Sequence, residues 1–320
     1  MTHAANEAGA VRIEDGTARI LHLSDVQFNR AWMGEGACAR AAGAGFFRGL
    51  LARLGDTRAY VRAAVLDAAA GGFIDAVVLT GDITHAGDAQ DQRLVRAALQ
   101  DALAEVGYPA GTVPMLAVPG NHDDRAAFRA AWCCAGADDG ACADSPVRAR
   151  LDLPSGLALV ALDTSDPERP DGRVDAGELA WLDRELADIA QSGREAIIVT
   201  HHHLCPSQSD MPACEGAAQV AGALHGRGCA GVLCGHTHHA ASGMAHGVPY
   251  WTAPSLSFAA DASLRDEAPW LFEPQAGEAQ KVVRFYESWG YSVHEVTPGG
   301  AVRSQAVTHT TGRLLGDLVL

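Results

Sequence analysis

The sequence predicts an α/β protein, and two observations carry the prediction. Short apolar runs recur along the chain and end in polar or glycine residues, which is typical of buried strands. Longer Ala-, Leu- and Arg-rich stretches lie between them, with apolar residues three and four apart, as at Leu179, Leu182 and Leu186, which is typical of helices that pack on a sheet. With 320 residues, 48% of them hydrophobic, the chain can bury one large core or two.

The individual elements follow from these patterns. Strands are expected at Ala18–Ser24, Ala76–Thr80, Met115–Val118, Ala158–Leu162, Ala196–Thr200 and Gly231–Cys234. Helices are expected at Gly45–Leu54, Ala59–Ala70, Ala89–Glu105, Asp124–Trp132 and Ala176–Gln191. After Trp251 the pattern changes, and two more strands, Lys281–Glu287 and Tyr291–Glu295, are expected on either side of a turn at Ser288–Gly290. We therefore expect an N-terminal tail at 1–17, a main domain at 18–255 and accessory strands or a cap at 256–320.

Charge and segment composition exclude several kinds of partner. The net charge is −15 and no basic stripe is visible, so a nucleic-acid polymer is not an expected partner. Residues Met1–Gly16 lack the basic and apolar regions of a secretory signal, and no apolar run is long enough to span a membrane, which predicts a cytoplasmic protein without a membrane partner. The eight cysteines form no C-x-x-C pairs and are expected to be reduced, with a Cys205–Cys214 disulfide as the alternative.

Residue types that bind metals follow the predicted strands at five places. They are Asp25 and Gln27 in SDVQ, Asp82 in TGD, Asn121 and His122 in PGNHDD, His201 in VTHHH, and His236 and His238 in CGHTHH. Each place alone has an ordinary explanation as a turn or a helix cap. Because ligands in α/β proteins bind at the carboxyl ends of the strands, the five places together indicate one site. Mixed nitrogen and oxygen donors are typical of divalent transition-metal sites.

This ordered series, D-x-(H), G-D, G-N-H-D, H and G-H-x-H, resembles the signature of the calcineurin-like metallophosphoesterases. The stretches LDTSDP, GELAWLDREL and GVPYWTAPS resemble the branch of class III cyclic-nucleotide phosphodiesterases and glycerophosphodiesterases. The resemblance implies a four-layer α/β/β/α sandwich of two mixed sheets, with the ligands on loops at one edge. It also implies that residues after Trp251 complete the second sheet and then form a cap, which in similar enzymes serves a homodimer.

The resemblance implies a role for each motif residue. One divalent cation would be held by Asp25, Gln27, Asp82 and His238, and a second by Asp82, Asn121, His201 and His236, with Asp82 as the bridge. A hydroxide shared by the two ions would then attack phosphorus in line. His122 would contact the phosphate and protonate the leaving oxygen, and Asp123 would orient it. The expected ions are Mn²⁺, iron (Fe²⁺ or Fe³⁺) or both, with Zn²⁺ as an alternative.

Gln27 departs from the family pattern, which has histidine there. An amide oxygen is a harder and weaker donor than imidazole. In the reading we favour, Gln27 coordinates through oxygen and shifts the preference toward Mn²⁺, as in the manganese-dependent ADP-ribose and CDP-alcohol pyrophosphatases, which this motif resembles. In the other reading the first metal site is lost and the chain is a binding module, like the retromer subunit with this fold. The retention of all other motif residues argues against the second reading.

The expected activity is hydrolysis of a small soluble phosphodiester, such as a cyclic nucleotide or a glycerophosphodiester. Nucleotide pyrophosphatase and phosphomonoesterase activities are the alternatives. Among the other histidines, His202 and His203 are expected either to line the pocket or to be solvated, and His239 to be an exposed neighbour of its motif. His22 alternates with apolar residues inside a strand and is expected to be a core histidine with satisfied hydrogen bonds.

Overall fold

The strands form two mixed sheets in a computed structural model that describes residues 15–33, 45–133, 146–207, 211–260 and 282–319. In the first sheet the order is β10-β11-β1-β2-β3, with β12 on the other side of β11. Its strands are β1 (Ala18–Leu23), β2 (Ala76–Thr80), β3 (Met115–Val118), β10 (Phe258–Ala260), β11 (Val282–Val296) and β12 (Val302–Val319). Strands β1, β2 and β3 are parallel, whereas β10, β1 and β12 are all antiparallel to β11.

The second sheet has the order β4-β5-β6-β7-β9-β8. Its strands are β4 (Arg148–Asp152), β5 (Leu157–Leu162), β6 (Glu195–Val199), β7 (Cys229–Cys234), β8 (Ala241–Ala245) and β9 (Val248–Thr252). Strands β5, β6, β7 and β9 are parallel, and antiparallel strands close both edges. The carboxyl ends of the parallel strands in both sheets therefore carry the loops that can form a site.

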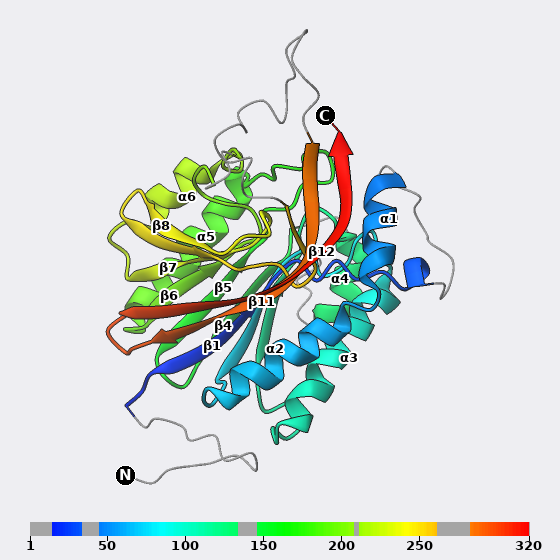
Figure 1. Cartoon of the computed structure of the whole chain (residues 1–320). Helices are drawn as coiled ribbons and strands as arrows, with labels where there is room; N and C mark the ends of the chain where they lie inside the picture. Colours follow the sequence, from blue (N-terminus) through cyan, green and yellow to red (C-terminus); the bar gives the residue numbers. More distant parts are fainter. Residues whose placement is uncertain (1–14, 34–44, 134–145, 208–210, 261–281, 320) are drawn as a thin grey trace.

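Helices cover the outer faces of the two sheets (Figure 1). They are the 3₁₀ helix η1 (Arg30–Met33) and the α-helices α1 (Gly45–Leu54), α2 (Arg58–Ala70), α3 (Ala89–Glu105), α4 (Arg125–Trp132), α5 (Ala176–Gln191) and α6 (Ala217–Leu224). Residues of α2, α3 and α4 pack with the first sheet in one apolar cluster, and residues of α5 and α6 pack with the second sheet in another. A third cluster, with Ile20, Val78, Leu159 and Ile197, joins the two sheets face to face. The predicted α/β/β/α sandwich is confirmed.

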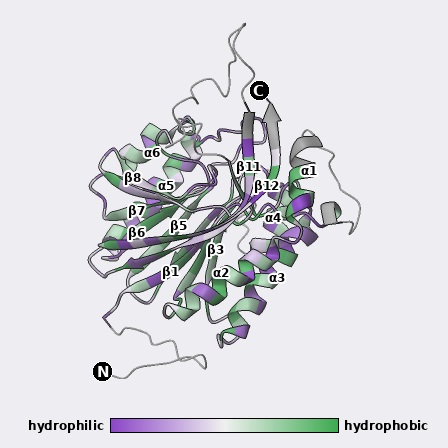
Figure 2. Cartoon of the chain, viewed as in Figure 1, coloured by the Kyte–Doolittle hydropathy of each residue, from purple (hydrophilic) through white to green (hydrophobic). Residues whose placement is uncertain are grey.

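The pattern of hydropathy explains why the layers form. Figure 2 shows apolar colour concentrated along the strands of the sandwich, while α2 and α3 mix apolar and hydrophilic residues. Strand β5 is buried at every position, as expected for a parallel strand that packs on both faces. In α3 the buried residues Val95, Leu99, Ala102 and Leu103 recur at helical spacing, so only one side of this helix faces the sheet.

All six strands and five helices expected up to Cys234 are present, with ends that differ by at most two residues. Asp124, expected as the first residue of a helix, is instead the N-cap of α4, where its side chain accepts a hydrogen bond from Ala127 N at 2.9 Å. Helix α6, the 3₁₀ helix η1 and the strands β4, β8, β9, β10 and β12 were not predicted. Among the described residues, no helix is both long enough and apolar enough to cross a membrane.

The predicted turn at Ser288–Gly290 is wrong. Strand β11 runs through these residues without interruption, and Gly290 pairs with Thr308 of β12. A Cβ atom on Gly290 would lie 2.4 Å from Val307 O and 2.8 Å from Pro254 Cγ. Glycine is therefore needed here for the close approach of neighbouring chains rather than for a turn. The predicted start of the first of these strands, Lys281, lies outside the described residues.

The segment after Trp251 also differs from the expectation, because it extends the first sheet and not the second. Strand β11 pairs with β1 from Ala18↔Val296 to His22↔Ser292. Residues 261–281 of the expected cap and residues 1–14 of the expected tail lie outside the described part of the chain. Cys205 and Cys214 are both free thiols, as expected for reduced cysteines, so the alternative of a disulfide between them is wrong.

Candidate metal centre

The seven predicted metal ligands lie at the carboxyl ends of five strands, on the edge where the two sheets meet. Asp25 and Gln27 follow β1, Asp82 follows β2, Asn121 follows β3, His201 follows β6, and His236 and His238 follow β7. Backbone hydrogen bonds join these loops to one another. The N–H of Asp25 donates to Gly81 O at 3.1 Å, that of Gln27 to Asp82 O at 2.9 Å, and that of Gly235 to His201 O at 3.0 Å.

Two serines that follow β9, Ser255 and Ser257, hold the backbone of Asp25 in place. Asp25 O accepts hydrogen bonds from Ser255 Oγ at 3.0 Å and Ser257 Oγ at 2.8 Å. The predicted boundary between residues 255 and 256 therefore falls between two serines that contact the same carbonyl. Because the backbone of Asp25 is held from two directions, its side chain has little freedom to leave the site.

Five of the predicted ligands have a left-handed backbone. Their φ angles are 52° at Asp25, 53° at Gln27, 48° at Asp82, 75° at His236 and 61° at His238. This conformation is uncommon for residues other than glycine, and such residues cluster at active sites and ligand sites. The strained backbone therefore marks the same loops that the sequence motifs marked.

The glycines of the motifs make room for the ligands. A Cβ atom on Gly120 would lie 2.1 Å from Asp82 Oδ1. On Gly235 it would lie 1.9 Å from Ser24 Oγ and 2.8 Å from Asp25 Oδ2. Any larger residue at these two positions would displace a carboxylate of the site, which is the physical reason for G-N and G-H in the motifs.

One group of donors consists of Asp25, Asp82 and His238, whose ligand atoms all lie within 4.8 Å of one another. Asp25 Oδ1 is buried, accepts no hydrogen bond and lies 3.3 Å from His238 Nε2. Nδ1 of His238 donates to Phe258 O at 2.9 Å, which directs Nε2 toward the carboxylate. Burial lowers the pKa of His238, but the charge of Asp25 outweighs it and raises that pKa above its usual value. Burial raises the pKa of Asp25, but the adjacent His238 outweighs it and lowers that pKa to about 2. An unpaired, ionised oxygen in this position fits a cation.

The second group is formed around His201. Its Nδ1 donates to Thr80 O at 2.6 Å, so a neutral ring has no hydrogen on Nε2. This Nε2 faces Asn121 Oδ1 at 3.1 Å and Asp82 Oδ1 at 3.5 Å. The ring of His236 lies 5.0 Å from that of His201, and burial lowers the pKa of His236 well below its usual value. A ring nitrogen that converges with an amide oxygen and a carboxylate oxygen also fits a cation.

Asp82 lies between these two groups. Its Oδ1 is on the side of His201 and accepts a hydrogen bond from His122 N at 2.9 Å. Its Oδ2 is on the other side and accepts a hydrogen bond from Gln27 Nε2 at 2.8 Å. This placement fits a carboxylate that two cations share.

Gln27 reaches the site but presents its nitrogen to Asp82. Its oxygen, Oε1, lies 2.6 Å from Nδ1 of His85. His85 is a residue of the site that the sequence did not indicate, because its place in THAG matches no ligand spacing. The only signal that could have found it is its position three residues after Asp82 on the same loop.

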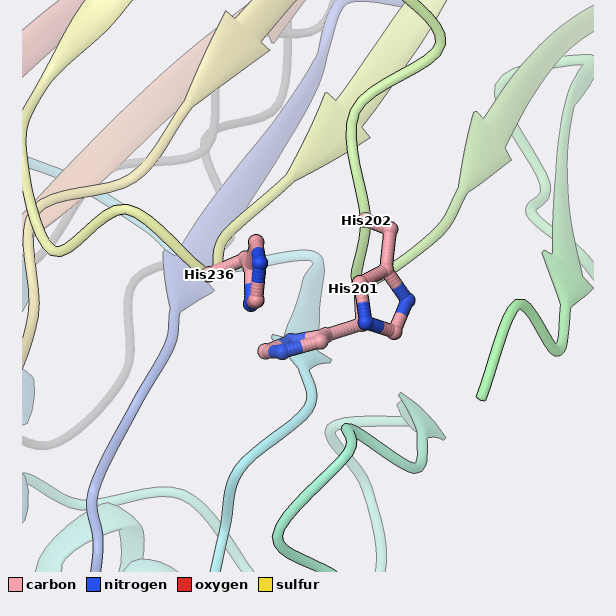
Figure 3. Close-up of side chains that lie close together, drawn as sticks. All are labelled: His201, His202 and His236. Atoms are coloured by element: carbon pink, nitrogen blue, oxygen red, sulfur yellow. The ribbon is translucent and has the colours of Figure 1, made fainter. Parts of the chain in front are cut away.

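His202 converges with His201 and His236, as Figure 3 shows. Its two ring nitrogens already have partners, since Nδ1 lies 2.9 Å from Thr164 Oγ1 and Nε2 lies 2.9 Å from Pro170 O. His202 therefore holds the loop after β5 and is not available as a ligand. The expectation of a solvated loop is wrong for His202 and for His203, which are each 1% exposed.

His122 and Asp123 have separate surroundings. The side chain of His122 is 38% exposed, its Nε2 lies 3.9 Å from Asp82 Oδ2, and its ring stacks on His85 with centroids 4.1 Å apart. Asp123 was expected to orient His122, but its partners are elsewhere. Its carboxylate accepts hydrogen bonds from Ile83 N, Thr84 N, Thr84 Oγ1, Gln92 Nε2 and Gly120 N. It joins the loops after β2 and β3, and burial together with the charge of Asp82 raises the pKa of Asp123 to about 6.

Two mixed sheets with this donor set at their common edge are the architecture of a metal-dependent phosphoesterase. The family model for calcineurin-like phosphoesterases matches residues 18–240, and the chain belongs to this family. It is 31% identical over 196 residues to a cAMP/cGMP dual specificity phosphodiesterase of Mycobacterium tuberculosis, which covers 59% of this chain and 57% of that protein. The chain thus spans just over half of that relative.

Two further comparisons agree with the family. A probable cyclic nucleotide phosphodiesterase of Rhodococcus erythropolis is 29% identical over 236 residues, or 73% of each protein. A crystal structure of a dimetal phosphatase from Danio rerio has the same fold, with a TM-score of 0.51, 14% identity, and coverage of 92% of this chain and 98% of that chain. The resemblance to the calcineurin-like metallophosphoesterases, with cyclic-nucleotide phosphodiesterases among the relatives, is confirmed.

Proposed function

We propose that this chain is a phosphodiesterase that hydrolyses a small soluble diester, such as a cyclic nucleotide or a glycerophosphodiester, at a centre of two divalent cations. The ligands would be Asp25, Gln27, Asp82, Asn121, His201, His236 and His238. The observation that carries the proposal is the carboxylate of Asp82 between two groups of donors, one of which includes the unpaired Oδ1 of Asp25. The names of the relatives favour a diester over other phosphate esters.

The donor set favours Mn²⁺ and Fe²⁺ or Fe³⁺, with Zn²⁺ as the alternative, because it mixes carboxylate and amide oxygens with imidazole nitrogens. When bound, two such ions supply positive charge beside the phosphoryl oxygens and lower the pKa of a water molecule. The residues of the chain set where this happens. Thr80 O and Phe258 O fix the rings of His201 and His238 through Nδ1 and keep their Nε2 atoms directed into the site.

His122 is the proposed proton donor to the leaving oxygen. Among the motif residues it combines an exposed ring with closeness to Asp82, so it can reach a bound phosphate ester from the solvent side. Its backbone is fixed at the site as well, since its N–H donates to Asp82 Oδ1. Both requirements of a general acid, access to the ester and a fixed position, are thereby supported.

A nucleotide pyrophosphatase is the second candidate, and Gln27 is the observation that favours it. The substrate class can be tested by comparing kcat/KM of the Mn²⁺-loaded protein for cyclic AMP, a glycerophosphodiester, ADP-ribose, a CDP-alcohol and a simple monoester. We expect the highest value for one of the first two, and no cleavage of single-stranded RNA, because the net charge of −15 repels a polyanion.

Each other result of this comparison has a definite meaning. A preference for ADP-ribose or a CDP-alcohol would replace the proposal with the pyrophosphatase, and a preference for the monoester would replace it with a phosphomonoesterase. A folded protein that binds Mn²⁺ and hydrolyses none of these compounds would be a binding module.

A further inference from the structure

His85 lies between two residues to which the proposed function gives different tasks. It follows β2 and is 5% exposed. Its backbone is fixed, because its N–H donates to Phe28 O at 3.1 Å and its carbonyl accepts a hydrogen bond from Asn29 Nδ2 at 2.8 Å. The edge of the ring meets Gln27, with Nδ1 2.6 Å from Oε1. The face of the ring meets His122, with centroids 4.1 Å apart and planes at 21°.

The hydrogen bonds of Gln27 have a defined direction. The carboxylate of Asp82 only accepts hydrogen bonds, so the atom of Gln27 that faces it at 2.8 Å is the amide nitrogen. The amide oxygen must then face His85, and since this oxygen also only accepts, Nδ1 of His85 carries the hydrogen. The orientation of the Gln27 amide and the tautomer of His85 therefore depend on each other.

This dependence matters because an amide has two different ends. Coordination of a cation through the oxygen of Gln27 requires the two ends to be exchanged, and the amide nitrogen then needs an acceptor on the side of His85. A neutral imidazole can serve in both cases, since either ring nitrogen can carry the hydrogen. A histidine at the position of Gln27 has no two ends that could be exchanged in this way, so the need for a partner that can both donate and accept follows from the glutamine.

We propose that His85 is a positioning residue that acts on two sides: its Nδ1 fixes the amide of Gln27 beside Asp82, and its ring face fixes His122. The proposal rests on the proposed function, in which Gln27 belongs to the cation site and His122 donates a proton. It adds a residue that touches neither cation nor substrate and that couples cation binding to proton donation.

Two substitutions separate the two sides of His85. In His85→Asn the side-chain amide occupies the place of Nδ1 and can still donate or accept, but the ring face is lost. In His85→Phe the ring face remains, but the hydrogen bond to Gln27 is lost. The same exchange at the exposed His225 of the chain, His225→Phe, controls for the change of residue type.

We expect the dissociation constant for Mn²⁺, measured by isothermal titration calorimetry, to rise roughly 10- to 100-fold in His85→Phe, the range for residues that support metal ligands. In His85→Asn we expect Mn²⁺ affinity close to that of the parent, while kcat for a chromogenic diester at saturating Mn²⁺ falls roughly 10-fold or more with KM unchanged, because a misplaced proton donor slows the reaction. His225→Phe should match the parent in both measurements.

A residue with a merely structural role would not weaken Mn²⁺ binding in one variant and lower kcat in the other. If both variants keep the Mn²⁺ affinity and kcat of the parent, or if both lose affinity, kcat and thermal stability together, the proposal is overturned. If the parent binds Mn²⁺ but cleaves no ester, the proposed function fails, while the Mn²⁺ affinity of His85→Phe still decides whether His85 positions Gln27.

Discussion

Two groups of histidines in the interior of this fold both contact Thr80 but differ in their hydrogen-bond partners. The first group, His201, His236 and His238, lies at the carboxyl ends of β6 and β7. The second is the pair His22 and His294, within the neighbouring strands β1 and β11. Burial lowers the pKa of His22, His236 and His294, so burial and a low pKa do not distinguish a site histidine from a core histidine.

The hydrogen-bond partners do distinguish them. In the pair, His22 Nδ1 lies 3.1 Å from His294 Nε2, His22 Nε2 lies 2.9 Å from Thr80 Oγ1, and His294 Nδ1 lies 2.7 Å from Ser304 Oγ. At the site, Nδ1 of His201 and of His238 donates to a backbone carbonyl, and Nε2 is directed toward the oxygens of Asn121, Asp82 and Asp25. The ring nitrogens of the pair contact one another and two hydroxyl groups, whereas Nε2 of His201 and of His238 is directed toward carboxylate or amide oxygens, as the proposed cation site requires.

The largest effect is expected for a substitution of Asp82, which lies between the two groups of donors in the candidate site. In Asp82→Asn the shared carboxylate loses its charge, so we expect both cations to bind more weakly and diester hydrolysis to fall to the background rate. The bound metal per chain, measured by elemental analysis after gel filtration, and kcat/KM test this. The control is Asp101→Asn, the same exchange at an exposed position of α3. Full activity in Asp82→Asn would show that Asp82 does not hold the cations.

A smaller effect is expected for a substitution of His122. This substitution should slow hydrolysis without weakening cation binding. For His122→Ala we expect near-normal Mn²⁺ content and a rate loss of roughly 10²- to 10⁴-fold, the range for a lost general acid. The loss should shrink for a diester whose leaving group is already a good one, such as a nitrophenolate, because that oxygen needs little help from a proton. Depleted metal in this variant would instead make His122 a ligand.

The sequence predicted that the candidate ligands share one edge of the fold, because each follows a strand whose apolar pattern is unambiguous. Asp82 follows AVVLT and His236 follows a run that ends in Cys234 and Gly235, so the topology alone brings them to one edge. His22 was correctly expected in the core, because its neighbours alternate with it inside a strand. These predictions depend on short-range patterns, which a single sequence contains.

The errors arose where long-range contacts decide the structure. Gly290 has the sequence neighbours of a turn residue, but its place is set by Pro254 and Val307, which are distant or on another strand. His202 and His203 follow a strand like solvated loop residues, yet Thr164, Pro170 and Thr252 enclose them. The role of His85 depends in the same way on Gln27 and His122, from two other loops, so its spacing from Asp82 could indicate its place at the site but not its partners.

The smallest expected effect concerns the core pair and is one of stability rather than activity. Burial lowers the pKa of His294 to about 3, below the value of 6.5 in an unfolded chain. The unfolded state therefore binds the proton first as the pH falls, and the stability that His294 contributes is present above pH 6.5 and lost between 6.5 and 3. From pH 7.5 to 5.5 this group should reduce the free energy of unfolding by about 1.4 kcal/mol.

His294→Gln tests this, because an amide at the place of Nε2 can still bond to His22 but does not titrate. We expect urea unfolding of the metal-free variant to show a loss of roughly 1–3 kcal/mol at pH 7.5, from the bond to Ser304. Its further loss between pH 7.5 and 5.5 should be smaller than that of the parent by about 1.4 kcal/mol. The histidines that do not contact residue 294 cancel in the comparison, and for His22 burial, the main cause of its low pKa, is unchanged. An equal pH dependence in both proteins would mean that His294 is protonated in the fold, and the contrast between the core pair and the site would then not hold.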